Sequence, residues 1–251
     1  MSIFSNPFFY ASAGSSFTPT TKGIFAFGHV CCYANTNISR LVSSSGVISA
    51  DITGVGTAQR QRAACTYGGD KGIYCFGQEA SAVTTIINLV SNSGVVASDT
   101  AGTGTGTNGG ACTSYGVGKG IKAYGWANGS VNDSNLISDA GVVAASITLV
   151  GTARWTLGGV AYGTTGSSVS ISNLVSNSGV VASDVTGVGT ARYGVAGVGY
   201  GSDKGILAFG TPSGYTAISN LVSSSGVVAS DTAAVGTATS ILHQGAGYST
   251  A

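Results

Sequence analysis

The sequence predicts an all-β fold, a five-bladed β-propeller built from four-stranded antiparallel blades. The first observation is a phrase close to Asn-Leu-Val-Ser-Asn-Ser-Gly-Val-Val-Ala-Ser-Asp, which occurs five times. Its leucines are Leu41, Leu89, Leu136, Leu174 and Leu221, and they lie 48, 47, 38 and 47 residues apart. Repeats of about 40–50 residues are typical of propeller blades or of helix-pair solenoids, so composition must decide between them.

Composition favours strands. Of the 251 residues, 41 are Gly, and Glu79 is the only Glu. Gly, Val and Thr are poor helix formers, because Gly loses backbone entropy and β-branched residues lose side-chain freedom. Only 8% of the residues are charged and 43% are hydrophobic, whereas disordered chains are charged and poor in apolar residues. We therefore expect an ordered all-β protein.

Each repeat divides into four short strands separated by turns rich in Gly, Ser and Asp. In the repeat that begins at Thr190, these strands are expected at residues 191–200, 205–210, 215–223 and 227–232. Four short antiparallel strands per repeat are typical of a propeller blade. The first strand is the richest in Gly and Ala, so we expect it to be innermost. The Val-Val-Ala-Ser-Asp strand is then outermost.

The two chain ends predict how the ring closes. The chain continues for 14 residues after Thr237, and the residue 14 positions after Thr57 is Lys71, at the turn between the first two strands. The N-terminal copy starts at the same turn, with Lys22. The C-terminus would thus supply the inner strand of one blade and the N-terminus its other three. Such closure removes exposed sheet edges and gives one propeller over residues 22–251.

The fourth repeat is shorter than the others. Nine residues are missing between Arg154 and Tyr162, in the inner hairpin. The deletion is either a harmless change at a turn or an asymmetric notch for a ligand or partner. In the second case Arg154 and Trp155 belong to a candidate ligand face.

Residues 1–21 lie outside the repeat and are predicted to form an aromatic arm. Five aromatic residues in this arm are candidates for docking: Phe4, Phe8, Phe9, Tyr10 and Phe17. Exposed aromatic side chains are costly unless they are covered. The arm therefore docks either on the protein's own flank or on a neighbouring subunit.

Charged side chains recur with the repeat. Four lysines are expected around one mouth of the channel: Lys22, Lys71, Lys119 and Lys204. They are either solvated turn residues with local ion pairs or a site for an anion or an acidic glycan. Four aspartates follow the outermost strand: Asp51, Asp99, Asp184 and Asp231. Each is expected to bond amides of the turn that follows, with calcium binding as the alternative.

The sequence does not favour catalysis. His29 and His243 are the only histidines, and the polar residues are copied around the ring, whereas an active site needs dissimilar groups at one place. None of the five cysteines lies in a Cys-x-x-Cys pair, and Cys75 takes a position that is Ala in other repeats. We expect no enzyme activity, no catalytic residues, no metal and no cofactor, with Cys75 a small buried residue.

Charge and hydropathy limit the partners. The net charge is +1 without a basic cluster, which argues against nucleic acid. No run of about 18 apolar residues is present, so membrane insertion is not expected. The N-terminal residues lack the pattern of a signal peptide, so synthesis in a cytoplasm is expected.

The repeats resemble kelch repeats. The strand Lys-Gly-Ile-x-Ala-Phe-Gly is similar to the kelch strand that ends in Gly-Gly, and Arg154 and Arg192 stand where kelch repeats have Arg. A closer resemblance is to kelch-like repeat proteins of bacteriophages, in which Gly-Val-Gly-Thr-Ala-Arg-Tyr-Gly and Gly-Asp-Lys-Gly-Ile recur in tandem. It covers residues 20–251 and implies a protein of the virion or its tail.

Two functions follow as expectations. The first is a structural protein of a virus particle, made in the host cytoplasm, held by its arm to other virion proteins and contributing to host attachment. The alternative is an adhesin or lectin module that reads host-surface glycan on one propeller face. It predicts exposed aromatic residues at loop tips, for which Trp126, Trp155 and Tyr215 are candidates.

Overall fold

The described part of the chain is built from β-strands. The computed structural model describes residues 2–3, 22–28, 34–157, 161–200, 204–233 and 236–238. Within them lie sixteen strands in five antiparallel sheets and no helix, so the predicted all-β class is confirmed. It follows that the described residues contain no helix able to cross a membrane.

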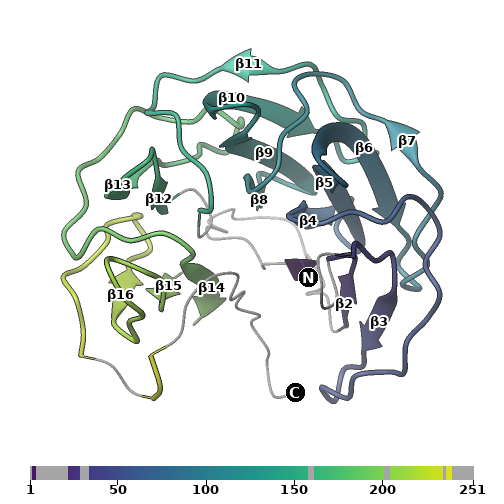
Figure 1. The fold of residues 1–251 in the computed structure, drawn as a ribbon, viewed down its shortest axis with the longest axis horizontal. Coiled ribbons are helices and arrows are strands. Elements are labelled where there is room, and N and C mark those ends of the chain that lie inside the picture. Colours follow the sequence, from purple (N-terminus) through teal and green to yellow (C-terminus); the bar gives the residue numbers. More distant parts are fainter. Residues whose placement is uncertain are drawn as a thin grey trace.

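The five sheets follow one another around an arc in chain order, each with its first strand towards the middle (Figure 1). The first contains β1 (Ser2–Ile3), β2 (Gly23–Ala26) and β3 (Ser39–Val42). The second contains β4 (Ala63–Tyr67), β5 (Lys71–Glu79), β6 (Ala82–Val90) and β7 (Thr100–Ala101). The third contains β8 (Ala111–Tyr115), β9 (Lys119–Trp126), β10 (Ser130–Ile137) and β11 (Ile147–Thr148). The fourth contains β12 (Ala161–Thr164) and β13 (Ser168–Ser172), and the fifth β14 (Ala196–Tyr200), β15 (Lys204–Ala208) and β16 (Ser219–Val222).

Small residues occupy the innermost strands because neighbouring sheets meet there. The Cys65 sulfur on β4 lies 2.7 Å from the Cys112 sulfur on β8. Further along the same two strands, the hydroxyls of Thr66 and Ser114 are 2.7 Å apart. Larger side chains would not fit at this separation, which agrees with the expected inner position of the first strand.

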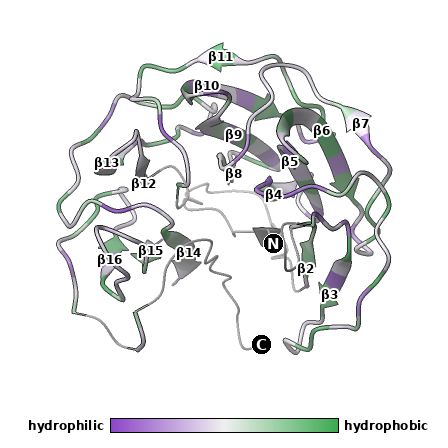
Figure 2. Ribbon diagram, in the orientation of Figure 1, coloured by the Kyte–Doolittle hydropathy of each residue, from purple (hydrophilic) through white to green (hydrophobic). Residues whose placement is uncertain are grey.

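The apolar core is divided between neighbouring sheets. One cluster joins the second and third sheets through residues such as Ile73 and Ile137, and another joins the first and second through Ile24 and Tyr74. Figure 2 shows hydrophobic stretches spread over all the sheets instead of being gathered in one of them. Contacts between these neighbouring sheets therefore stabilise them, whereas a separate cluster of Val195, Leu207, Val222 and Val228 belongs to the fifth sheet.

The outermost strand is shorter than predicted. Where the sequence predicts a strand at residues 227–232, the structure has two isolated bridges, Val222 with Val228 and Ser219 with Thr232. Between them the Asn220 side chain donates its Nδ2 hydrogen to the Ala229 carbonyl at 3.0 Å. A side-chain donor thus replaces a backbone donor in the ladder, and regular pairing is interrupted there.

The strand that pairs with β2 on its inner side is β1. Ser2 lies opposite Ala26 and Ile3 opposite Phe25. The sequence predicts an arm at Ser2 and Ile3 and a C-terminal strand at this position, and the observed pairing of β1 with β2 corrects the prediction for these two residues. Residues 239–251 lie outside the described residues, and so do the docking candidates Phe4, Phe8, Phe9, Tyr10 and Phe17.

In four sheets, an aromatic residue and the Gly that follows it, both with positive φ, lie in the second strand or directly after it. The pairs are Phe27–Gly28, Phe76–Gly77, Tyr124–Gly125 and Phe209–Gly210. In the second sheet this pair shifts the register between β5 and β6. The aromatic ring is then covered by a cation of the next sheet: the Arg62 guanidinium lies 4.2 Å from the Phe27 centroid, and that of Arg154 4.1 Å from the Tyr124 centroid. These contacts join consecutive sheets.

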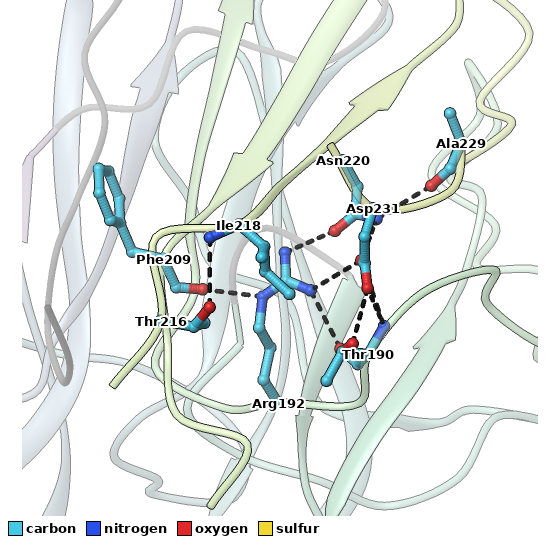
Figure 3. A network of polar contacts seen from close by, with 8 residues as sticks. All are labelled: Thr190, Arg192, Phe209, Thr216, Ile218, Asn220, Ala229 and Asp231. Carbon is cyan, nitrogen blue, oxygen red and sulfur yellow. Dashed lines mark hydrogen bonds and ion pairs between the residues drawn. The ribbon is translucent and has the colours of Figure 1, made fainter. Parts of the chain in front are cut away.

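A polar network crosses the strands of the fifth sheet (Figure 3). Arg192 donates from Nε to the Phe209 carbonyl at 2.8 Å and from Nη2 to Asn220 Oδ1 at 2.5 Å. Asn220 in turn donates to Asp231 at 2.8 Å. The same carboxylate accepts from both the backbone N–H and the hydroxyl of Thr190. The network therefore connects Thr190, which precedes the inner strand of the sheet, with Asp231 at the outer edge of the sheet.

The second and fourth sheets repeat this network. In the second sheet it contains Thr57, Arg62, Asn88 and Asp99, and in the fourth Thr152, Arg154, Asn173 and Asp184. The aspartates therefore bond a threonine that precedes them, which corrects the expectation of bonds to the following turn. Asp51 differs, since it forms an exposed ion pair with Arg40 at 2.5 Å.

The third sheet lacks the arginine. Asn135 occupies the Asn220 position, and within the described residues its Oδ1 atom is buried without a partner. A buried lysine, Lys122, forms an ion pair with Asp133 at 3.2 Å and lies 5.3 Å from the Phe76 centroid. Lys122 thus replaces the arginine as the covering cation but leaves the amide oxygen of Asn135 unpaired.

The repeated aspartates make stability depend on pH. Desolvation acts to raise the pKa of Asp231, but hydrogen bonds from Thr190 and Asn220 outweigh it and hold the pKa below its ordinary value. A carboxyl whose pKa is depressed by folding stabilises the fold above its unfolded pKa of about 3.9, and this contribution is lost as the pH falls through the folded pKa. We expect the free energy of unfolding, measured with urea between about pH 3 and 7, to decline on the acid side. The Asp231→Asn variant should show a smaller decline, and an unchanged decline would contradict this role.

Candidate functional site

Each inner strand is preceded by a short stretch of chain, which we call its entry segment. One position in these entry segments carries a different residue in each sheet. Residues at this position form an isolated bridge with the end of the neighbouring strand. The pairs are Arg60 with Gln78, Asn108 with Trp126, Trp155 with Thr164, and Tyr193 with Thr211. The polar networks are copied from sheet to sheet, whereas these pairs are all different. Recognition of a specific ligand needs such dissimilar residues.

A chain of backbone hydrogen bonds fixes these entry segments relative to one another. Gly109 donates its N–H to the Gln61 carbonyl at 3.0 Å, Thr156 to Gly109 at 2.8 Å, and Gly194 to Thr156 at 3.2 Å. All four residues have positive φ. Each comes directly after one of the variable residues Arg60, Asn108, Trp155 and Tyr193. The variable side chains are thus carried by a rigid frame.

A groove of about 670 Å³ lies over the second and third sheets and reaches the start of the fourth. Its lining residues come from the entry segments and from the ends of the hairpins: Arg60, Gln61, Gln78, Ser81, Ala82, Val83, Asn108, Trp126, Asn128 and Trp155. The two indoles lie against each other, with ring centroids 5.3 Å apart and ring planes tilted by 50°. Trp126 is 38% exposed, so part of its ring faces solvent.

Three polar side chains in the groove hold one another in place. Gln78 Oε1 accepts from Arg60 Nε at 3.3 Å and from Asn108 Nδ2 at 3.1 Å. Within the described residues, Asn108 Oδ1 is buried without a hydrogen-bond partner. The groove therefore combines aromatic faces with polar side chains that are held by bonds to one another.

Arg154 and Trp155, the two candidate residues beside the deletion in the fourth repeat, lie in different surroundings. Trp155 lines the groove, whereas Arg154 is fully buried and stacks on Tyr124. Desolvation lowers the pKa of Arg154, against the opposing effects of Tyr124 and Asp184. Arg154 is therefore part of the fourth sheet's polar network and does not reach the groove.

The sequence pattern does not indicate four residues that line the groove: Arg60, Gln78, Asn108 and Asn128. Arg60 and Trp155 each stand three positions after the threonine that begins their repeat, Thr57 and Thr152. They differ in residue type, so the repeat pattern alone does not mark them as members of one site. A comparison of the non-repeated residues around the entry segments could have found the site.

The recurring lysines lie at the strand ends away from the groove. Lys71, Lys119 and Lys204 begin β5, β9 and β15, and they and Lys22 are exposed. Gln78, by contrast, lies near the other end of β5. Lys71 lies 3.5 Å from Asp70, which also accepts from Asn92 at 2.9 Å. These contacts fit a solvated turn with local ion pairs, and the anion-site alternative stays a prediction.

The described cysteines are buried, as predicted for Cys75. Desolvation raises the pKa of Cys65 and of Cys112, so their thiols remain protonated at neutral pH. The described residues contain no group of three or more His, Cys, Asp or Glu side chains placed to hold a metal ion. Cys31, Cys32, His29 and His243 lie outside the described residues.

The groove is suited to binding a ligand that has both apolar and hydroxylated surface. Indole faces cover apolar C–H groups, and amide and guanidinium groups bond hydroxyl or anionic oxygens. Its volume lies within the usual range for small-ligand sites. The chain matches no model of a known protein family and no curated protein. Its function is therefore inferred from this groove and from the sequence.

Proposed function

We propose that the protein is a closed five-bladed propeller without enzyme activity and that it binds a carbohydrate in the groove lined by Trp126 and Trp155. The observation that carries the proposal is the pair of indoles, 5.3 Å apart, in a groove that is also lined by the side-chain amides of Gln78 and Asn128. Pyranose rings present C–H groups on their faces and hydroxyls around their edges. An aromatic surface bordered by amides complements both.

Ring closure is supported by the backbone chain through Gln61, Gly109, Thr156 and Gly194. These residues come from four successive sheets. Alignment of Thr237 with Thr190 gives residue 241 the equivalent fifth position, which lies outside the described residues. A closed ring would hold the groove between two blades whose separation is fixed on both sides.

The setting we propose is a virus particle. The kelch-like phage resemblance over residues 20–251 and the low charge, 8% of residues, support it. The carbohydrate would then belong to the host surface, and the N-terminal arm would hold the protein to other virion proteins. Detection of the chain in purified particles by mass spectrometry tests this setting, and its absence from them would contradict it.

Loss of Trp126 should strongly weaken carbohydrate binding. Large aromatic residues at the centre of a binding site typically contribute about 2 kcal/mol or more, so the Trp126→Ala variant is expected to bind at least roughly 30-fold more weakly. A glycan array probed with both proteins measures the difference. Because Trp126 is partly exposed, the variant should keep its fold, which a thermal unfolding curve checks.

The matched control is Tyr215→Ala. Tyr215 is 67% exposed and lies outside the groove, so its removal should leave binding unchanged. The proposal fails if the wild-type protein binds no carbohydrate on the array. It also fails if the Trp126 variant binds as well as the wild type.

A further inference from the structure

Arg60 differs from other arginines in the described part of the chain. Arg40, Arg154 and Arg192 each lie within 4 Å of a carboxylate oxygen, at 2.5, 3.6 and 3.8 Å. Arg62 is buried and bonded to Asn88. Arg60 has no carboxylate partner among the described residues, and it lines the groove. A guanidinium remains charged at any ordinary pH, so this positive charge is available to a ligand.

The Arg60 side chain is held in place before any ligand arrives. Its Nε donates to Gln78 Oε1 at 3.3 Å and its Nη2 to the Ala80 carbonyl at 3.3 Å. A guanidinium has about five N–H donors, so most of them remain for a ligand. Its planar fork matches a carboxylate in a two-bond geometry. Such preorganisation reduces the entropy lost on binding.

We infer that the groove binds a carbohydrate that carries a carboxylate, such as a sialic or uronic acid unit. The carboxylate binds Arg60, a ring face lies on the indoles, and hydroxyls reach the side-chain amide of Gln78. The inference rests on the proposed carbohydrate binding and adds the chemical class of the sugar. The proposed carboxylate site is distinct from the recurring lysines, which are exposed at the opposite strand ends.

Matched glycans and matched charge variants test this inference. The probes are sialylated and uronic-acid-containing glycans on an array beside their neutral parents, and the proteins are the wild type, Arg60→Gln, Arg60→Lys and Lys71→Gln. The wild type should bind acidic glycans at least about tenfold more tightly than the neutral parents, the size of a charged hydrogen-bonded pair. Arg60→Gln should lose this preference while its residual binding to neutral glycans is retained.

The other two variants separate charge from geometry and one face from the other. Arg60→Lys keeps the charge without the fork, so it should retain a reduced preference. Lys71→Gln removes the same charge from the opposite strand end and should bind as the wild type does. Equal binding of acidic and neutral glycans by the wild type would overturn the inference. So would a preference for acidic glycans that survives in Arg60→Gln or is lost in Lys71→Gln. Each of these results would leave the proposed carbohydrate binding intact. Binding to no glycan at all would overturn both proposals.

Discussion

Replacement of Arg192 by methionine is expected to lower the free energy of unfolding by about 3–5 kcal/mol, the usual cost of removing one partner from a buried charged network. Arg192 is fully buried, and methionine retains much of its length without its donors. The carbonyls of Phe209 and Thr190 and the Oδ1 atom of Asn220 would each lose a hydrogen bond. Urea denaturation followed by circular dichroism measures the change.

Arg40→Met is the control for this experiment. Arg40 also forms an ion pair, with Asp51, but both side chains are substantially exposed. Surface ion pairs contribute about 0–1 kcal/mol, so this variant should remain close to the wild type. Equal losses in the two variants would show that the buried network has no special role.

The Gly77→Ala substitution should have the second large effect. Gly77 has a φ of +132°, and a Cβ there would lie 2.7 Å from Arg62 Cγ and 3.0 Å from the Arg60 carbonyl. Backbone strain of this kind costs about 1–3 kcal/mol, and the contact with the buried Arg62 adds to it. We expect a loss of at least about 2 kcal/mol in the free energy of unfolding. Because Gly77 precedes Gln78, binding in the groove should weaken as well.

Gly214→Ala provides the comparison. Gly214 has no heavy atom within 4 Å of the added Cβ, and its φ lies outside the strained range. Alanine at such a position usually stabilises by about 0.4–1 kcal/mol, because the unfolded chain loses freedom. A Gly77 variant as stable as the Gly214 variant would contradict the need for glycine in the aromatic-Gly pair.

Repeat spacing and composition predicted the parts of the fold that depend on pattern. The all-β class and the inner position of strands such as β4 follow from the period and from small side chains such as Cys65. The length of the outermost strand was not predictable, because the side-chain amide of Asn220 takes the place of a backbone donor there. Nothing in a strand pattern shows that a side chain will interrupt a ladder.

The candidate site was only partly predictable for a related reason. Trp155 was found because the repeat breaks beside it, but Arg154, its neighbour, points into the sheet and belongs to the polar network. Arg60, Asn108 and Trp155 align in the sequence, but only the fold shows that these three different side chains line one groove. The repeated residues thus build the frame, and the non-repeated residues on it build the groove.

The central claim, that a carbohydrate binds on the paired indoles of Trp126 and Trp155, can be tested directly by NMR. The chain has 2 Trp residues, so an amide correlation spectrum contains a signal from each indole N–H and no others of that kind. Titration with an acidic glycan that the protein binds should shift both indole signals, and the Trp126→Ala variant assigns them. Saturable binding that leaves both indole signals unmoved would place the ligand elsewhere and contradict the account.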